Sequence, residues 1–120
     1  MQEIEEFKIT FGLTVYGLEV ESRGIFRQQF PASAGGANPS SLIPYNSVNC
    51  LPNEMENILE WLGRNLAGSY TGISISVRIA SSLSWGEVII PQEILKVAGK
   101  YSCEIKVLFS SKTSGQAKGT

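Results

Sequence analysis

The chain has 120 residues, of which 42% are hydrophobic and 18% charged, as is typical of one globular domain rather than of a disordered chain. Its net charge is −1, so ten basic residues among eleven acidic ones do not provide the dense positive surface that nucleic-acid binding requires. The chain has no histidine and no aspartate, which removes the usual neutral-pH base, the commonest metal ligand and Asp-rich calcium loops. We therefore expect a protein that is not an enzyme and that holds no metal or cofactor.

Cysteine usage and the N-terminus favour a cytoplasmic location. Cys50 and Cys103 are too few for an all-cysteine zinc site. A disulfide between them is possible but is not indicated by the sequence, because a secreted protein that depends on disulfides normally has more cysteines. The acidic segment 1–6 lacks the positive charge of a signal peptide, and no apolar run approaches the ~20 residues of a membrane span.

The first segment, Phe7–Val15, alternates apolar and polar residues and predicts a strand with one buried face. The alternation changes phase at Tyr16 and Gly17, which predicts a bend or bulge there. Glu21–Gly24 is typical of a turn, and Ile25–Phe30 is expected to be the return strand of a hairpin.

Pro31–Pro52 begins with small, flexible residues and continues with apolar residues that show no clean periodicity. A connection of about twenty residues is longer than usual in one domain. Two interpretations stay open: the apolar residues fix the loop to the core, or the loop faces a partner.

The pattern over Asn53–Leu66 predicts the main helix. Asn53 is placed to cap its N-terminus, with Glu56 completing a capping box. Trp61 is expected at the edge of the buried stripe. That stripe consists of apolar residues at helical spacing, namely Met55, Ile58, Leu59, Leu62 and Leu66.

Two further alternating segments, Thr71–Ala80 and Tyr101–Phe109, predict strands. Between them, residues 87–90 suggest a short strand, and Pro91–Gly99 suggest a two-turn helix that begins at the proline and ends at the glycine.

These elements predict an α+β fold in which a mostly antiparallel sheet carries two helices on one face, with a ferredoxin-like variant as one form of it. The order of the strands is not determined by the sequence. We expect a single domain over residues 1–110 and a flexible polar tail over residues 111–120.

Candidates for chemistry are few. Gly35 and Gly36 lie in a loop, without the lysine and spaced glycines of a phosphate or dinucleotide motif. The neighbours of Cys50 give no sign of the electropositive surroundings that activate a thiol. The glutamate pairs are better explained as surface residues than as a catalytic pair.

Aromatic residues in loops are better candidates for binding a partner. We single out Trp85, Tyr45 and Tyr16, together with the apolar residue Ile43. Tryptophan and tyrosine dominate interface hot spots because they bury much area with few rotatable bonds. Each of the aromatics could equally cover the core from a loop.

The segment Gly72–Phe109 combines an alternating strand, a Gly-containing loop, the motif Ile90-Pro91-Gln92-Glu93-Ile94-Leu95 and a final alternating strand. It resembles the C-terminal half of small bacterial domains of unknown function, some of which are regarded as immunity proteins of polymorphic-toxin systems. The resemblance implies an α+β domain that binds and blocks a toxin, and it assigns no functional residue.

The sequence is therefore compatible with three functions. The first is a non-catalytic protein-binding domain, such as an immunity or inhibitor protein that occludes a partner. The second is a small-molecule-binding or enzymatic domain with a pocket between sheet and helices. The third is a structural homo-oligomer, for example a homodimer, that pairs through an edge strand.

Overall fold

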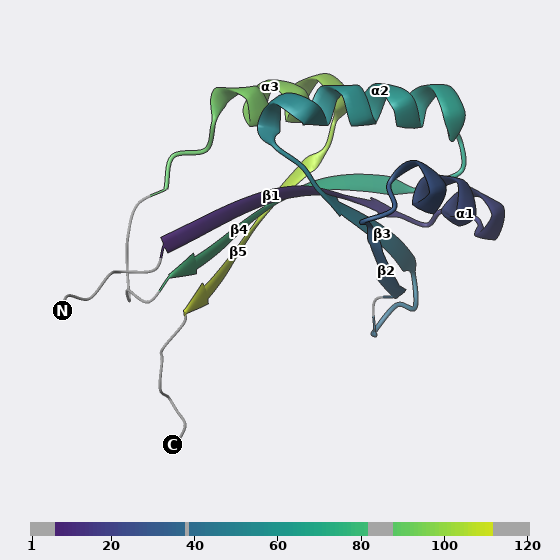
Figure 1. The fold of residues 1–120 in the computed structure, drawn as a ribbon, viewed down its shortest axis with the longest axis horizontal. Coiled ribbons are helices and arrows are strands. Elements are labelled where there is room, and N and C mark those ends of the chain that lie inside the picture. The colour runs from purple at the N-terminus through teal and green to yellow at the C-terminus, as the bar shows by residue number, and fades with distance from the viewer. Residues whose placement is uncertain (1–6, 38, 82–87, 112–120) are drawn as a thin grey trace, which may run out of the picture.

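The computed structural model describes residues 7–37, 39–81 and 88–111 (Figure 1). In chain order, the elements are β1 (Phe7–Tyr16), α1 (Val20–Gln29), β2 (Ala34–Ala37), β3 (Pro44–Asn49), the 3-10 turn η1 (Pro52–Glu54), α2 (Met55–Asn65), β4 (Gly72–Ser81), α3 (Gln92–Tyr101) and β5 (Glu104–Ser111).

The five strands form one sheet in the order β2-β3-β1-β4-β5. All neighbouring pairs are antiparallel except β4 and β5, which are parallel. A parallel pair needs a crossover connection, and α3 supplies it. The predicted fold class, α+β with a mostly antiparallel sheet, is confirmed.

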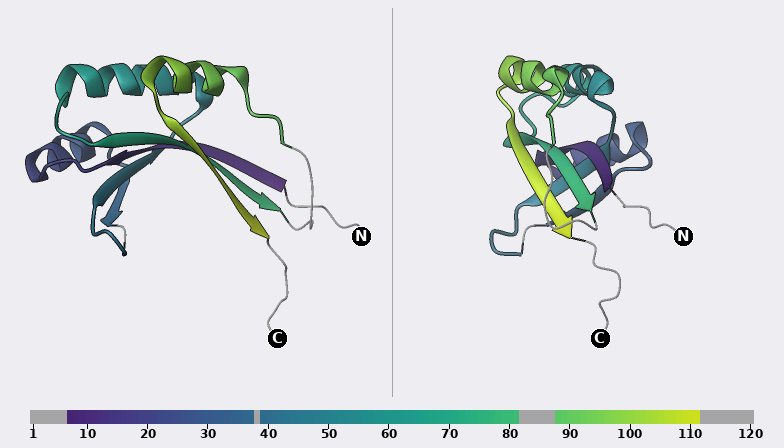
Figure 2. Two further views of the ribbon diagram at one scale, coloured as in Figure 1. Left: turned by 180° about the vertical axis from the view of Figure 1, so that it is seen from behind. Right: turned by 90° about the vertical axis from the view of Figure 1, so that its left-hand side faces the viewer.

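Helices α2 and α3 lie along one face of the sheet, and α1 lies beside one end of it, next to β3 (Figures 1 and 2). Three α-helices are described, so the expectation of two was wrong. The strand ends near both chain termini project beyond the helices, and none of the described helices lies on the opposite face of the sheet (Figure 2).

The additional helix arises where the sequence suggested a turn and a return strand. Glu21–Gly24 and Ile25–Phe30 lie in α1 or at its end, so both predictions were wrong. Phe26 is fully buried, and its ring centre lies 4.9 Å from that of Phe30 and 6.5 Å from that of Trp61 on α2. Phe26 and Phe30 are four residues apart, a spacing that fits one face of a helix as well as one face of a strand.

The long connection predicted over Pro31–Pro52 contains two strands instead. β3 pairs with β1, placing Val48 opposite Leu13, and β2 pairs with β3 at the edge of the sheet. Both strands are short, and β2 consists only of alanine and glycine, so neither shows the apolar alternation by which strands are recognised.

Helix boundaries also differ from the sequence prediction. Asn53 lies within η1 and does not cap α2, and the backbone N–H of Leu51 instead donates to Glu54 Oε1 at 2.8 Å. Helix α3 passes through Gly99 and ends at Tyr101, and the capping residue Ser102 has a φ of 56°. Tyr101 therefore belongs to α3, and β5 begins three residues later than expected.

The other predicted segments lie at the borders of the described residues or at the end of β1. Residues 88–90 form no strand, and Glu87 lies outside the described residues. The predicted tail also lies outside them, except Ser111, which ends β5. Gly17 has a φ of 77° and turns the chain out of β1, so the predicted bend is confirmed.

The core lies between the sheet and the helices. Leu13 on β1 stands opposite Ile75 on β4, which stands opposite Ile105 on β5, and the first two are fully buried. Met55, Leu59 and Leu62 of α2, with Ile94 and Val97 of α3, cover this row from above. The apolar alternation of β1 and β4 is thereby confirmed as the inner face of the sheet.

Candidate functional site

β5 is the last strand of the sheet, and in the described part of the chain it pairs only with β4. Three consecutive apolar residues near its end are about half exposed: Val107 at 53%, Leu108 at 48% and Phe109 at 52%. Val107 and Phe109 share the inner face with Val77 and Ile79, but this end of the sheet projects beyond the helices (Figure 2). The edge therefore offers both backbone groups and apolar side chains.

The open face of the sheet, opposite α2 and α3, is lined by hydroxyl groups. Thr14 Oγ1 and Ser47 Oγ, on the paired strands β1 and β3, are hydrogen-bonded at 2.9 Å. Ser74 and Ser76 on β4 are almost fully buried between larger neighbours. Cross-strand pairs of this kind stabilise a sheet without an apolar layer above it.

A tyrosine and a lysine meet on this face. Lys106 Nζ donates to Tyr16 Oη at 3.0 Å, and Tyr16 Oη is hydrogen-bonded to Ser74 Oγ at 3.1 Å. Burial raises the pKa of Tyr16, but hydrogen bonds from Lys106 and Ser74 and the lysine charge outweigh it, so the pKa is lowered overall. The hydrogen bond to Tyr16 raises the pKa of Lys106. Lys106 is therefore held as a cation over the sheet.

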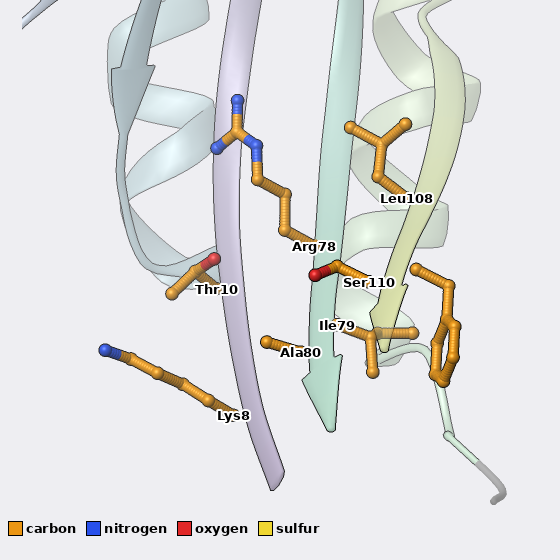
Figure 3. A pocket seen from close by; sticks show the side chains of 8 residues that line it. Lys8, Thr10, Arg78, Ile79, Ala80, Leu108 and Ser110 are labelled. Carbon is orange, nitrogen blue, oxygen red and sulfur yellow. The ribbon is translucent and has the colours of Figure 1, made fainter. Parts of the chain in front are cut away.

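A hollow of about 260 Å³ lies at the end of this face, over β1, β4 and β5 (Figure 3). Lys8 and Thr10 line it from β1, and Leu108 from β5. Arg78 of β4 extends its guanidinium across β1, where Nη1 donates to Asn49 Oδ1 at 3.2 Å. The hollow continues the exposed apolar edge of β5 across the open face, where Lys8 and Arg78 are its basic lining residues.

Two of the four residues singled out as partner-binding lie together. Tyr16 and Tyr45 are opposite each other on β1 and β3, and both line a second hollow on the open face, of about 280 Å³. Ile43 is 43% exposed and precedes β3. Trp85 lies outside the described residues. That any of the four contacts a partner stays a prediction.

Sequence reasoning missed the edge of β5. Its strand pattern was recognised, but Leu108 interrupts the polar face between Lys106 and Ser110. Three apolar residues in a row leave one apolar side chain on the open face whichever face is buried. The apolar run at residues 107–109 was therefore the feature of the sequence that could have indicated an exposed edge.

Neither cysteine has the surroundings of a reactive thiol. Both are free. Burial, with a smaller effect of the Glu54 charge, raises the pKa of Cys50 to about 12. Burial also raises the pKa of Cys103. Among residues 7–37, 39–81 and 88–111, no group of three or more cysteine or acidic side chains is placed to hold a metal ion.

Comparison with protein-family models, with curated proteins and with solved structures found no significant match. The resemblance of residues 72–109 to immunity-type domains therefore stays a prediction. In the part of the chain that the structure describes, no helix has the length and apolar character needed to cross a membrane.

Proposed function

We propose that the protein is a non-catalytic protein-binding domain, and that an extended segment of a partner protein adds to its sheet along β5. The observation that carries this proposal is the edge of β5, where backbone groups that no described strand pairs coincide with the half-exposed residues Val107, Leu108 and Phe109. Strand addition draws affinity from main-chain hydrogen bonds and specificity from alternate side chains. Half-exposed apolar side chains on both faces of the edge strand can supply that specificity.

The topology supports this interpretation. We infer that β1, α1, β2, β3, α2 and β4, with the strand order β2-β3-β1-β4, form the predicted ferredoxin-like variant. Helix α3 and strand β5 are then an addition that moves the edge of the sheet from β4 to β5. The added segment falls within residues 72–109, whose resemblance to immunity-type domains favours a partner that is inhibited when it is bound.

Self-association through the same edge is the second candidate. If β5 paired antiparallel with β5 of a second copy around Val107, Ile105 would stand opposite Phe109 of the other copy, and Val107 opposite its own equivalent. The inner face of such a pair would be apolar over residues 105–109. Homodimers commonly use a surface that is complementary to itself in this way.

Lysine substitutions at the edge test both candidates. Charged side chains on edge strands prevent pairing with other chains. We expect Val107→Lys to fold as the wild type does, because the side chain is half exposed, and to lose the bound partner. Val20→Lys on α1 is the matched control, since it makes the same chemical change at a side chain that is 74% exposed and far from β5 in the fold.

The experiment has two measurements. Light scattering over a concentration series shows whether the wild type dimerises and whether Val107→Lys abolishes the dimer. Affinity capture from the cells that produce the protein, followed by titration with each purified captured protein, shows whether binding is lost in Val107→Lys and kept in Val20→Lys. A monomer at every concentration, together with partners that bind both variants as they bind the wild type, would overturn the proposal.

A further inference from the structure

A third hollow, of about 580 Å³, lies between α1 and the strands β2 and β3, away from β5. Arg23 and Arg27 line it from α1, Gly35 and Gly36 from β2, and Tyr45 and Asn46 from β3. None of the described residues that line it is acidic, in a chain whose net charge is −1. Its electrostatic character is therefore opposite to that of the whole chain.

The two arginines are placed for one ligand. They are four residues apart, so they lie on the same side of α1. Arg23 Nε donates to the backbone carbonyl of Leu18 at 3.2 Å, which fixes the side chain and leaves its terminal nitrogens to the hollow. Within the described residues, Arg27 has no hydrogen bond or ion pair.

The buried amide of Asn46 is the second, independent observation. Its side chain is 1% exposed, and neither Nδ2 nor Oδ1 has a hydrogen-bond partner among the described residues. A polar group left unsatisfied in this way lowers stability, so its presence at the base of a hollow indicates a role other than stabilising the fold.

The absence of a side chain at Gly35 leaves space beside these donors. A Cβ atom at Gly35 would lie 3.3 Å from Arg27 Nη2 and 3.4 Å from Asn46 Nδ2, so both nitrogens border the space above that residue. A Cβ atom at Gly36 would lie 2.7 Å from Tyr45 Oη, because the tyrosine ring crosses over the backbone there. A side chain at Gly35 would therefore fill the space beside Arg27 and Asn46, whereas one at Gly36 would point to the opposite face and meet Tyr45.

The rim holds a strained residue. Leu42, which also lines the hollow, has a φ of 61°, a left-handed conformation that is unfavourable for a leucine. Strain of this kind gathers at ligand-binding positions, where the surrounding structure maintains it.

We propose that this hollow, lined by Arg23, Arg27 and Asn46, binds the oxyanion group of a small molecule, either a carboxylate or a phosphate. Guanidinium groups bind both through paired, charge-assisted hydrogen bonds. The Asn46 amide, whose Nδ2 borders the same space over Gly35 as Arg27 Nη2, supplies a further donor. The site is separate from the β5 edge and does not depend on the proposed protein partner.

The test is a titration of isotope-labelled protein followed by NMR, with inorganic phosphate in one arm and succinate in another. Sodium chloride at matched ionic strength is the blank. We expect saturable shifts of the Asn46 side-chain NH₂ signals in at least one arm. Saturation by phosphate would identify a phosphate ligand, and saturation by succinate would identify a carboxylate ligand. If neither arm shifts these signals beyond the blank, the proposal is wrong.

Variants separate a site from a general charge effect. We expect Arg27→Gln to weaken binding about tenfold or more, as the loss of a hydrogen bond between charged groups implies. Arg64→Gln, at an exposed position on α2, makes the same change and should bind as the wild type does. Equal affinities of the two variants would show that the arginine pair holds no ligand.

A third variant tests the amide. Asn46→Leu keeps a similar volume and removes the unsatisfied polar group, so we expect a higher denaturant midpoint together with lost binding. A lower midpoint would show that the amide serves the fold, which would remove the second observation behind the proposal.

Discussion

Truncation of Ile75 tests how the sheet is assembled. The side chain is fully buried on β4, between Leu13 on β1 and Ile105 on β5. Replacing it with alanine removes about three carbon groups, which at about 0.8 kcal/mol each gives a transfer cost of about 2.4 kcal/mol. Incomplete collapse of the cavity raises the expected loss to about 2–5 kcal/mol of the free energy of unfolding.

The neighbouring strand supplies graded comparisons. Ile105 stands in the same row but is only partly buried, because β5 is at the edge, so we expect Ile105→Ala to cost about half as much. Leu108 points to the open face and is half exposed, and Leu108→Ala should cost about 1 kcal/mol or less.

Chemical denaturation followed by circular dichroism measures all three. The slope against denaturant shows whether each variant keeps a two-state transition with the same exposed surface. Equal losses for Ile75→Ala and Ile105→Ala would mean that β5 is not an edge strand. A loss below about 1 kcal/mol for Ile75→Ala would refute the position of the core itself.

Two further predictions concern single residues. Gly17→Ala should lower the free energy of unfolding by about 1–2 kcal/mol or more, because an L-residue at a φ of 77° is strained and its Cβ would lie 2.6 Å from Thr71 Oγ1. The control Gly63→Ala, at an open position of α2, should be neutral or stabilising. Thermal unfolding of the two variants measures the difference, and a stabilised Gly17→Ala would contradict the turn. Burial raises the pKa of Cys50 from 9.0 to about 12, so the thiol loses its proton at a lower pH in the unfolded chain than in the folded protein. The free energy of unfolding should therefore fall as the pH rises from about 9 towards 12, by at most about 1.4 kcal/mol per pH unit. Denaturation under reducing conditions at pH 7 and 9.5 should show this decrease in the wild type and a smaller one in Cys50→Ala, and equal decreases would show that the thiol is not buried.

Strong alternation was sufficient for part of the fold. The strands β1 and β4 and the helix α2 were predicted from periodicity, because each buries one continuous apolar face. α1 was mistaken for a strand since its buried aromatic residues, Phe26 and Phe30, fit either period, and its partner Trp61 lies more than thirty positions away. β2 was missed because its glycines and alanines pair through the backbone alone.

The candidate sites show the same limit. The pairing of Tyr16 with Tyr45 depends on the register of β1 and β3, which no local pattern states. The arginine hollow requires α1 to be a helix, since only a helical turn places Arg23 and Arg27 side by side. Position in the sheet, rather than residue type, turns the apolar end of β5 into an exposed edge.

Hydrogen–deuterium exchange of β5 in the bound state is the most direct test of the proposed function. In a parallel pair, only alternate N–H groups of an edge strand bond to the neighbouring strand, so those on the free side of β5 exchange quickly in the unbound protein. When a captured partner or a second copy is bound, we predict slowed exchange over residues 104–111 in the wild type and not in Val107→Lys. Exchange that slows elsewhere on the protein while residues 104–111 stay unchanged would contradict docking at this edge.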